Sequence, residues 1–98
     1  MLISSVVQNE AQRNEDMIRQ YEALISELPK GSLICRKKEY YYLKYREGNK
    51  IRDEYIGKNP DAVSAIREKL SLRRHYAEML IALKQEQKAI HKILEELI

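Results

Sequence analysis

Residues 33–57 constrain the fold most, because they carry strand chemistry between two long helical patterns. The stretch contains five of the seven tyrosines and places lysine or arginine at nearly every polar position. Aromatic and β-branched enrichment, alternation and interrupting turn residues predict a small sheet over about 33–56. We expect three strands at about 33–36, 40–46 and 50–56, with reversals at Lys37-Lys38 and Gly48-Asn49.

The pairing of the second and third strands depends on the length of the loop between them. A three-residue loop at Gly48-Asn49-Lys50 would pair Leu43 with Tyr55 and Lys44 with Glu54. This register keeps the apolar residues on one face: Tyr41, Leu43, Tyr45, Ile51 and Tyr55. The opposite face then carries a mostly basic set, which we expect to be hydrated: Tyr40, Tyr42, Lys44, Arg46, Arg52 and Glu54.

A first helix is predicted over about 5–28. Ser5 and Gln8 form a capping box, and apolar residues recur at spacings of three and four residues. The segment from Gln8 to Asp16 is almost wholly polar, so we expect this part to be exposed or frayed. Pro29 and Gly31 end the helix and allow the chain to reverse.

A second helix is predicted over about 60–97. Asn59 is the expected N-cap, and Pro60 occupies the first helical position. No glycine or proline follows, so the helix could be about 55 Å long. The pattern leaves open whether it is continuous or broken near Ser71.

Apolar residues of this second helix, Ile66 among them, follow a heptad spacing. An apolar ridge of this length would expose a large patch if nothing covered it. The first helix could cover part of it as an antiparallel hairpin, and a second copy of the chain could cover the rest. The candidate interface residues, for intramolecular core or for a homodimer, are Tyr76, Leu80, Leu83, Ile90, Leu94 and Leu97.

The composition is that of one globular domain of 98 residues, with 44% hydrophobic and 34% charged residues. Together with the two helical patterns and the central strands, it predicts an α+β fold. No run of 18 apolar residues occurs, and Met1-Leu2-Ile3 is too short and lacks the basic flank of a secretion signal. We therefore expect a cytoplasmic protein without a membrane partner.

The residues that carry chemistry do not form a catalytic or metal-binding pattern. The single cysteine, Cys35, lies in a strand and is expected to be a small buried hydrophobe. His75 and His91 are sixteen residues apart in helical sequence, and Asp53 and Glu54 point to opposite faces of a strand. We expect no enzyme, no cofactor, no metal and no small-molecule substrate.

Positive charge is concentrated on the predicted sheet. The net charge is −3 over residues 1–29, +5 over 30–58 and +1 over 59–98. Lysine and arginine could follow a phosphate backbone, and tyrosines could bond phosphates or stack on unpaired bases. The candidate nucleic-acid contacts are Arg36, Lys37, Lys38, Tyr40, Tyr42, Lys44, Arg46 and Arg52. Two alternatives stay open, a solvated basic face and an acidic protein partner.

Three motifs indicate a family resemblance: LPKGSL at 28–33, EYYYLKYREGNKIRDEYIGK at 39–58 and RRHYAEML at 73–80. They resemble a family of small bacterial and archaeal proteins of unknown function, often found near mobile elements. The resemblance covers about 28–97 and rests on strand and turn residues. Many members carry a cysteine cluster between the first two strands, whereas this chain has Arg-Lys-Lys-Glu at 36–39, so no metal role is carried over.

The sheet also resembles, more distantly, the three-stranded DNA-contacting sheets of tyrosine-recombinase arm domains. From these observations we expect a non-catalytic nucleic-acid-binding module of a mobile element or phage. The alternative is a protein-interaction module that uses its helices to oligomerise or to inhibit a host or defence enzyme. Nucleic-acid binding should weaken steeply with salt, whereas an apolar helical interface should persist.

Overall fold

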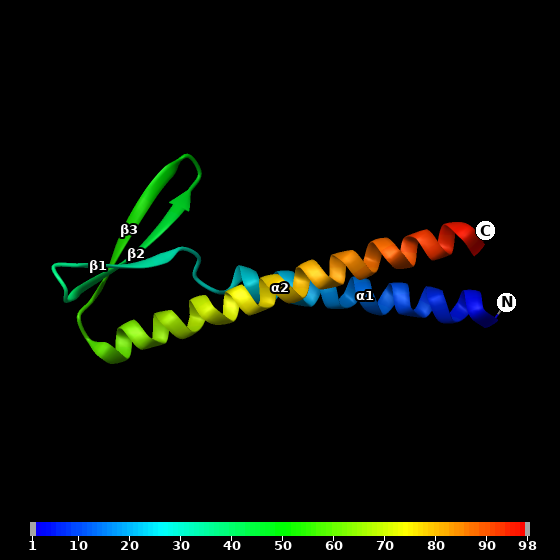
Figure 1. Cartoon of the computed structure of the whole chain (residues 1–98), viewed down its shortest axis with the longest axis horizontal. Coiled ribbons are helices and arrows are strands. Elements are labelled where there is room, and N and C mark those ends of the chain that lie inside the picture. The colour runs from blue at the N-terminus through cyan, green and yellow to red at the C-terminus, as the bar shows by residue number, and fades with distance from the viewer. Residues whose placement is uncertain (1, 98) are drawn as a thin grey trace. The chain divides into compact units, whose positions relative to one another are not determined.

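The computed structural model describes residues 2–97, which form, in chain order, a helix, a three-stranded sheet and a second helix (Figure 1). The elements are α1 (Leu2–Ser26), β1 (Ser32–Arg36), β2 (Tyr40–Glu47), β3 (Lys50–Gly57) and α2 (Pro60–Leu97). This arrangement confirms the predicted α+β fold. The chain divides into two compact units: the helical unit contains α1 and α2 from His75 onward, and the sheet unit runs from Leu28 to Arg74.

The helical unit is an antiparallel helix pair, as two contacts between α1 and α2 show. The Asn14 side-chain amide donates a hydrogen bond to the Leu83 carbonyl at 2.9 Å. Two helical turns further along α1, the rings of Tyr21 and Tyr76 meet edge to face, with centroids 5.5 Å apart. Residue numbers therefore rise along α1 as they fall along α2, and the predicted hairpin is confirmed.

Most residues from Gln8 to Asp16 are exposed, as expected, but this part of α1 is not frayed and one of its residues is buried. The helix is regular from Leu2 to Ser26, and Asn14 is only 1% exposed. Its amide nitrogen donates to Leu83 and also to Glu86 Oε1 at 3.1 Å, which offsets part of the cost of burying a polar group. The polar character of this segment predicted exposure for every residue in it. Asn14 can nevertheless be buried, because two acceptors on α2 receive hydrogen bonds from its amide.

The predicted seam of α2 is mostly covered within a single chain. Leu83 is buried, Tyr76, Leu80, Ile90 and Leu94 are half-buried, and Leu97 is exposed. The side chain of Ile18 on α1 is buried as well. The apolar ridge therefore supplies the core of the helical unit.

In the sheet unit, β1, β2 and β3 form an antiparallel meander in chain order. The predicted reversal at Lys37-Lys38 is confirmed: both residues have positive φ, 55° and 65°, and the Glu39 N–H donates to the Arg36 carbonyl at 3.3 Å. Positive φ at both central positions is the geometry of a type I′ turn, which usually selects asparagine or glycine. Two lysines therefore hold a conformation that is uncommon for their type.

The second hairpin has a shorter loop than expected, which changes its register. Gly48 and Asn49 alone connect Glu47 to Lys50, and of the two only Gly48 has positive φ. Glycine with positive φ at the first central position is typical of a type II′ turn, which suits the twist of the flanking strands. Leu43 therefore pairs with Glu54 rather than with Tyr55, and the predicted pairing is wrong.

The corrected register divides the sheet residues differently between the two faces. One face, here the covered face, carries Leu33, Cys35, Tyr41, Leu43, Tyr45, Arg52 and Glu54. The other, here the open face, carries Ile34, Arg36, Tyr40, Tyr42, Lys44, Arg46, Ile51, Asp53 and Tyr55. Ile51 and Tyr55, expected on the apolar face, are instead 60% and 57% exposed, because the turn geometry determines the register.

The part of the covered face around Tyr41 and Leu43 packs against the first turns of α2. Leu43 and Val63 are the buried apolar residues of this unit. Asn59 caps the helix as predicted: its Oδ1 accepts a hydrogen bond from the Asp61 N–H at 2.9 Å, and the Val63 N–H donates to its carbonyl at 3.1 Å. Ser71 lies inside α2, which is a single helix from Pro60 to Leu97.

Candidate nucleic-acid interface

A hollow on the open face brings together residues from all three strands. It has a volume of about 610 Å³ and is lined by Arg36, Lys37, Tyr40, Tyr42 and Tyr55. The register explains this set, because Arg36 pairs with Tyr40 across β1 and β2, and Tyr42 pairs with Tyr55 across β2 and β3. Lys37 joins them from the adjoining turn. The site therefore combines three tyrosines with two cationic side chains.

Arg36 is held in place by two contacts on the open face. Its Nη2 lies 2.8 Å from Asp53 Oδ2, and its guanidinium carbon lies 4.6 Å from the centroid of the Tyr42 ring. The centroid of the Tyr42 ring in turn lies 5.2 Å from the centroid of the Tyr55 ring, and the two ring planes are inclined at 58°. Asp53 partly neutralises Arg36, so Arg36 orients the tyrosines as well as adding charge.

The other predicted basic contacts of the open face have free side chains. Among residues 2–97, no ion pair involves Lys37, Lys38, Lys44 or Arg46. Lys44 and Arg46 are two residues apart on β2 and therefore point to the same side, about 7 Å apart. These four cations can accept a phosphate without first breaking an ion pair.

Arg52 is the predicted contact that the structure separates from the others. It pairs with Tyr45 and so lies on the covered face, together with Glu54. Its Nε lies 3.6 Å from Glu47 Oε2. The expectation that Arg52 and Glu54 share the face of Tyr40 and Tyr42 is wrong, because the two-residue loop shifts β3 by one position.

The same shift brings in two residues that the sequence analysis left out of the site, Asp53 and Tyr55. The signal that could have found them is Gly48-Asn49, since glycine at the first position of a two-residue loop indicates a type II′ turn. With that loop length, Tyr42 necessarily faces Tyr55.

Charge is divided sharply between the two units. The sheet unit has thirteen lysine and arginine residues against six acidic ones, a net charge of +7. The rest of the chain has five basic residues against nine acidic ones, a net charge of −4. The overall +3 therefore understates the positive charge around the sheet.

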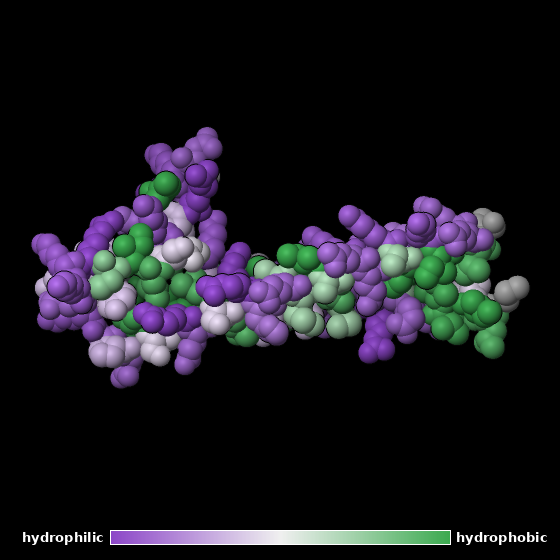
Figure 2. All heavy atoms as spheres, in the orientation of Figure 1, coloured by the Kyte–Doolittle hydropathy of each residue, from purple (hydrophilic) through white to green (hydrophobic). Residues whose placement is uncertain are grey.

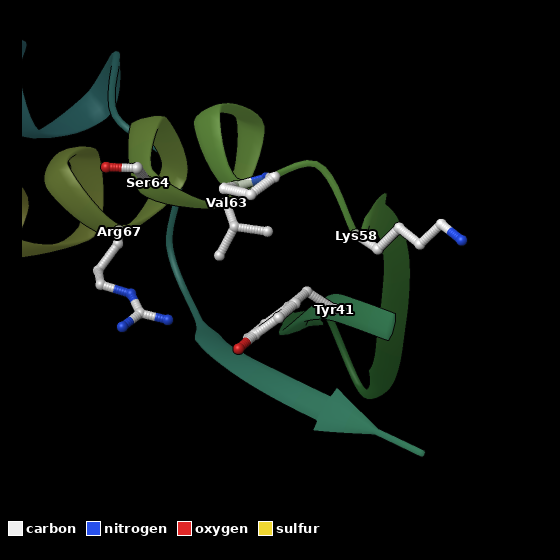
Figure 3. Close-up of a pocket in the computed structure, with 6 residues that line it drawn as sticks. Tyr41, Lys58, Val63, Ser64 and Arg67 are labelled. Atoms are coloured by element: carbon white, nitrogen blue, oxygen red, sulfur yellow. The ribbon is translucent and has the colours of Figure 1, made fainter. Parts of the chain in front are cut away.

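A second hollow lies between the covered face and the start of α2 (Figure 3). Figure 3 shows the Tyr41 ring below Val63, with its hydroxyl directed to the side on which Arg67 extends. Lys58 extends in the opposite direction. Since the two cations do not converge, this hollow reflects packing of the sheet on the helix and is the weaker candidate site.

The residues considered for other chemistry do not gather at either hollow. Cys35 is exposed, so the expectation that it is buried is wrong. In the described part of the chain, no three His, Cys, Asp or Glu side chains are grouped as metal ligands. No helix within residues 2–97 has the length and apolar character needed to cross a membrane.

The fold and the site together define a small helix–sheet–helix protein with a basic, tyrosine-lined sheet face. A family described as "Domain of unknown function (DUF6788)" matches residues 7–65, which is more than half of the chain. The chain belongs to this family. The matched range includes every residue of the open face. No curated protein and no solved structure matches the chain.

Proposed function

We propose that the chain is a non-catalytic nucleic-acid-binding module of a mobile element or phage, acting in the cytoplasm. In this proposal the open face contacts the phosphates of DNA or RNA. The observation that carries it is the set of cations beside the tyrosine-lined hollow that form no ion pair with any described residue, within a unit of net charge +7. Phosphate contacts by such residues supply affinity that does not depend on sequence.

The distribution of charge supports the same surface. Lys37 and Lys38 lie at one end of the open face, and Lys44 and Arg46 follow along β2, so that cations border the tyrosines on two sides. The net charge of −4 outside the sheet unit disfavours phosphate contact there. Binding should therefore be confined to the sheet unit.

Charge reversal on the two faces of the sheet tests this assignment. The double change Lys44→Glu and Arg46→Glu should weaken binding at least about tenfold and lower the slope of log K against log salt by about two, because two phosphate contacts are lost. The measurement is fluorescence anisotropy of labelled single-stranded and duplex DNA at roughly 50 and 200 mM salt.

Arg52→Glu is the matched control, since it reverses a charge on the same sheet but on the covered face. The affinity of this variant for DNA should stay within about twofold of the parent affinity. The small loss reflects the weaker long-range attraction between the sheet unit and the phosphates. Arg52→Glu changes the net charge half as much as the double change does. A loss of affinity half as large on a logarithmic scale would therefore mean that binding follows net charge and not the open face.

A specific observation favours a second candidate, a protein-interaction module. Apolar side chains are exposed where α1 begins and α2 ends, at one end of the helical unit (Figure 2). The exposed residues there are Leu2, Ile3, Val6, Ile93 and Leu97. Exposed apolar clusters of this kind mark association surfaces, here for a second copy of the chain or for a host or defence enzyme.

Assembly through this end predicts a change in mass. Under this candidate the parent chain is larger than a monomer in multi-angle light scattering, and Ile93→Lys returns it to a monomer by placing a charge in the patch. Ile81→Lys is the matched control: Ile81 is 59% exposed on the same helix but lies outside the patch. A monomeric parent, or equal effects of both changes, would exclude self-association through this patch.

A further inference from the structure

We infer that the ligand of the open face is single-stranded nucleic acid, whose unpaired bases enter the hollow and stack on Tyr55. This inference rests on the proposed function and adds the form of the ligand and the way it is held. It depends on the arrangement of the rings, on the free cations around them and on what a duplex can offer to such a surface.

The rings of the hollow are available for stacking. The ring centroids of Tyr42 and Tyr55 lie 5.2 Å apart and the rings are tilted by 58°, so the two rings are not stacked face to face. The Arg36 guanidinium occupies one side of Tyr42, whereas Tyr55 is 57% exposed. The volume of about 610 Å³ in front of these rings is ample for a flat heterocycle.

The cations are placed for the backbone of a strand whose base occupies the hollow. Lys37 is part of the hollow lining, and Lys44 and Arg46 continue along the same face of β2. None of the three forms an ion pair within residues 2–97. Aromatic platforms bordered by free cations are the arrangement that binds single strands with little sequence preference.

A duplex cannot use the tyrosines in this way. Its bases stack on one another, and only their edges are accessible from the grooves. The rings line a hollow between strands, so they can reach the face of a base only if that base is unpaired. A duplex would therefore gain phosphate contacts alone, whereas a single strand gains phosphate contacts and stacking.

The test compares ligands that differ in their bases at equal length. The probes are labelled oligothymidine, oligouridine, an abasic deoxyribose-phosphate strand and a duplex, each titrated with the full chain at roughly 50 mM salt. Stacking predicts that oligothymidine binds about tenfold or more tighter than the abasic strand and than the duplex. Comparing the affinity for oligouridine with the affinity for oligothymidine shows whether the protein prefers RNA or DNA as the single strand.

Two changes at one position isolate the ring. Tyr55→Leu should lower the affinity for oligothymidine about tenfold and leave binding of the abasic strand unchanged, whereas Tyr55→Phe should keep the parent affinity for both. Circular dichroism spectra that superimpose on the parent spectrum establish that the variants are folded. If the abasic strand or the duplex binds as tightly as oligothymidine, stacking is excluded while the proposed function stands. If no probe binds, the inference and the proposed function both fail.

Discussion

Replacing Gly31 by alanine is expected to lower the free energy of unfolding by about 3–4 kcal/mol, the largest effect we expect at any glycine. Gly31 has φ +118°, a conformation that side chains rarely adopt. An added Cβ would collide with the Lys44 carbonyl and lie 2.9 Å from Tyr45 Cβ. Because these neighbours belong to the central strand, they cannot move without disturbing the sheet.

Gly48→Ala is the control for this prediction. Gly48 also has positive φ, +62°, but nothing lies within 4 Å of the position that a Cβ would take. It should therefore cost only about 1–2 kcal/mol, the conformational part of the effect. Urea unfolding followed by tyrosine fluorescence reports on the sheet, which holds five of the seven tyrosines in a chain without tryptophan. Equal losses for the two changes would contradict the close approach of Gly31 to β2.

Asn14→Asp should have an effect of similar size in the helical unit, about 3–5 kcal/mol of destabilisation. Asn14 is 1% exposed, and its amide nitrogen donates to the Leu83 carbonyl and to Glu86 Oε1. A carboxylate would place oxygen against both acceptors and bury a charge beside Glu86. The loss should appear as a lower urea midpoint in the helical circular dichroism signal.

Asn14→Leu separates the loss of hydrogen bonds from the burial of a charge. Asn14 Oδ1 is buried and, among the described residues, has no hydrogen-bond partner, so the parent already carries an unsatisfied acceptor. Leucine, which has the same branching but a larger volume, removes the unsatisfied acceptor along with the two donated bonds, and the Leu83 carbonyl keeps its hydrogen bond within α2. The change should alter stability by no more than about 1 kcal/mol. A loss equal to that of Asn14→Asp would show that the donated bonds dominate.

The proposed function and the further inference make different demands on the open face. Phosphate contact needs Lys44 and Arg46, neither of which forms an ion pair within residues 2–97 or lines the tyrosine hollow. Stacking needs Tyr55, whose position depends on its pairing with Tyr42. The two sets of variants therefore report separately on affinity for the backbone and on affinity for unpaired bases.

Local chemistry in the sequence determined the order of the elements and most of their boundaries. Strand enrichment, the lysine and glycine reversals and the Asn59 cap each act over a few residues, and the structure contains each of them. The antiparallel helix pair could also be predicted from the sequence, because two helices with apolar stripes, joined by a short sheet, can bury these stripes against each other.

The backbone of one turn decided the register of β3, and tertiary structure decided the burial of Asn14. The register depends on the backbone of Gly48-Asn49, where a two-residue type II′ turn shifts every later residue by one position and moves Arg52 to the covered face. Burial of Asn14 depends on acceptors 69 and 72 residues away, Leu83 and Glu86. A sequence pattern measures periodicity along the chain, whereas strand pairing and polar burial depend on partners that only the folded chain brings together.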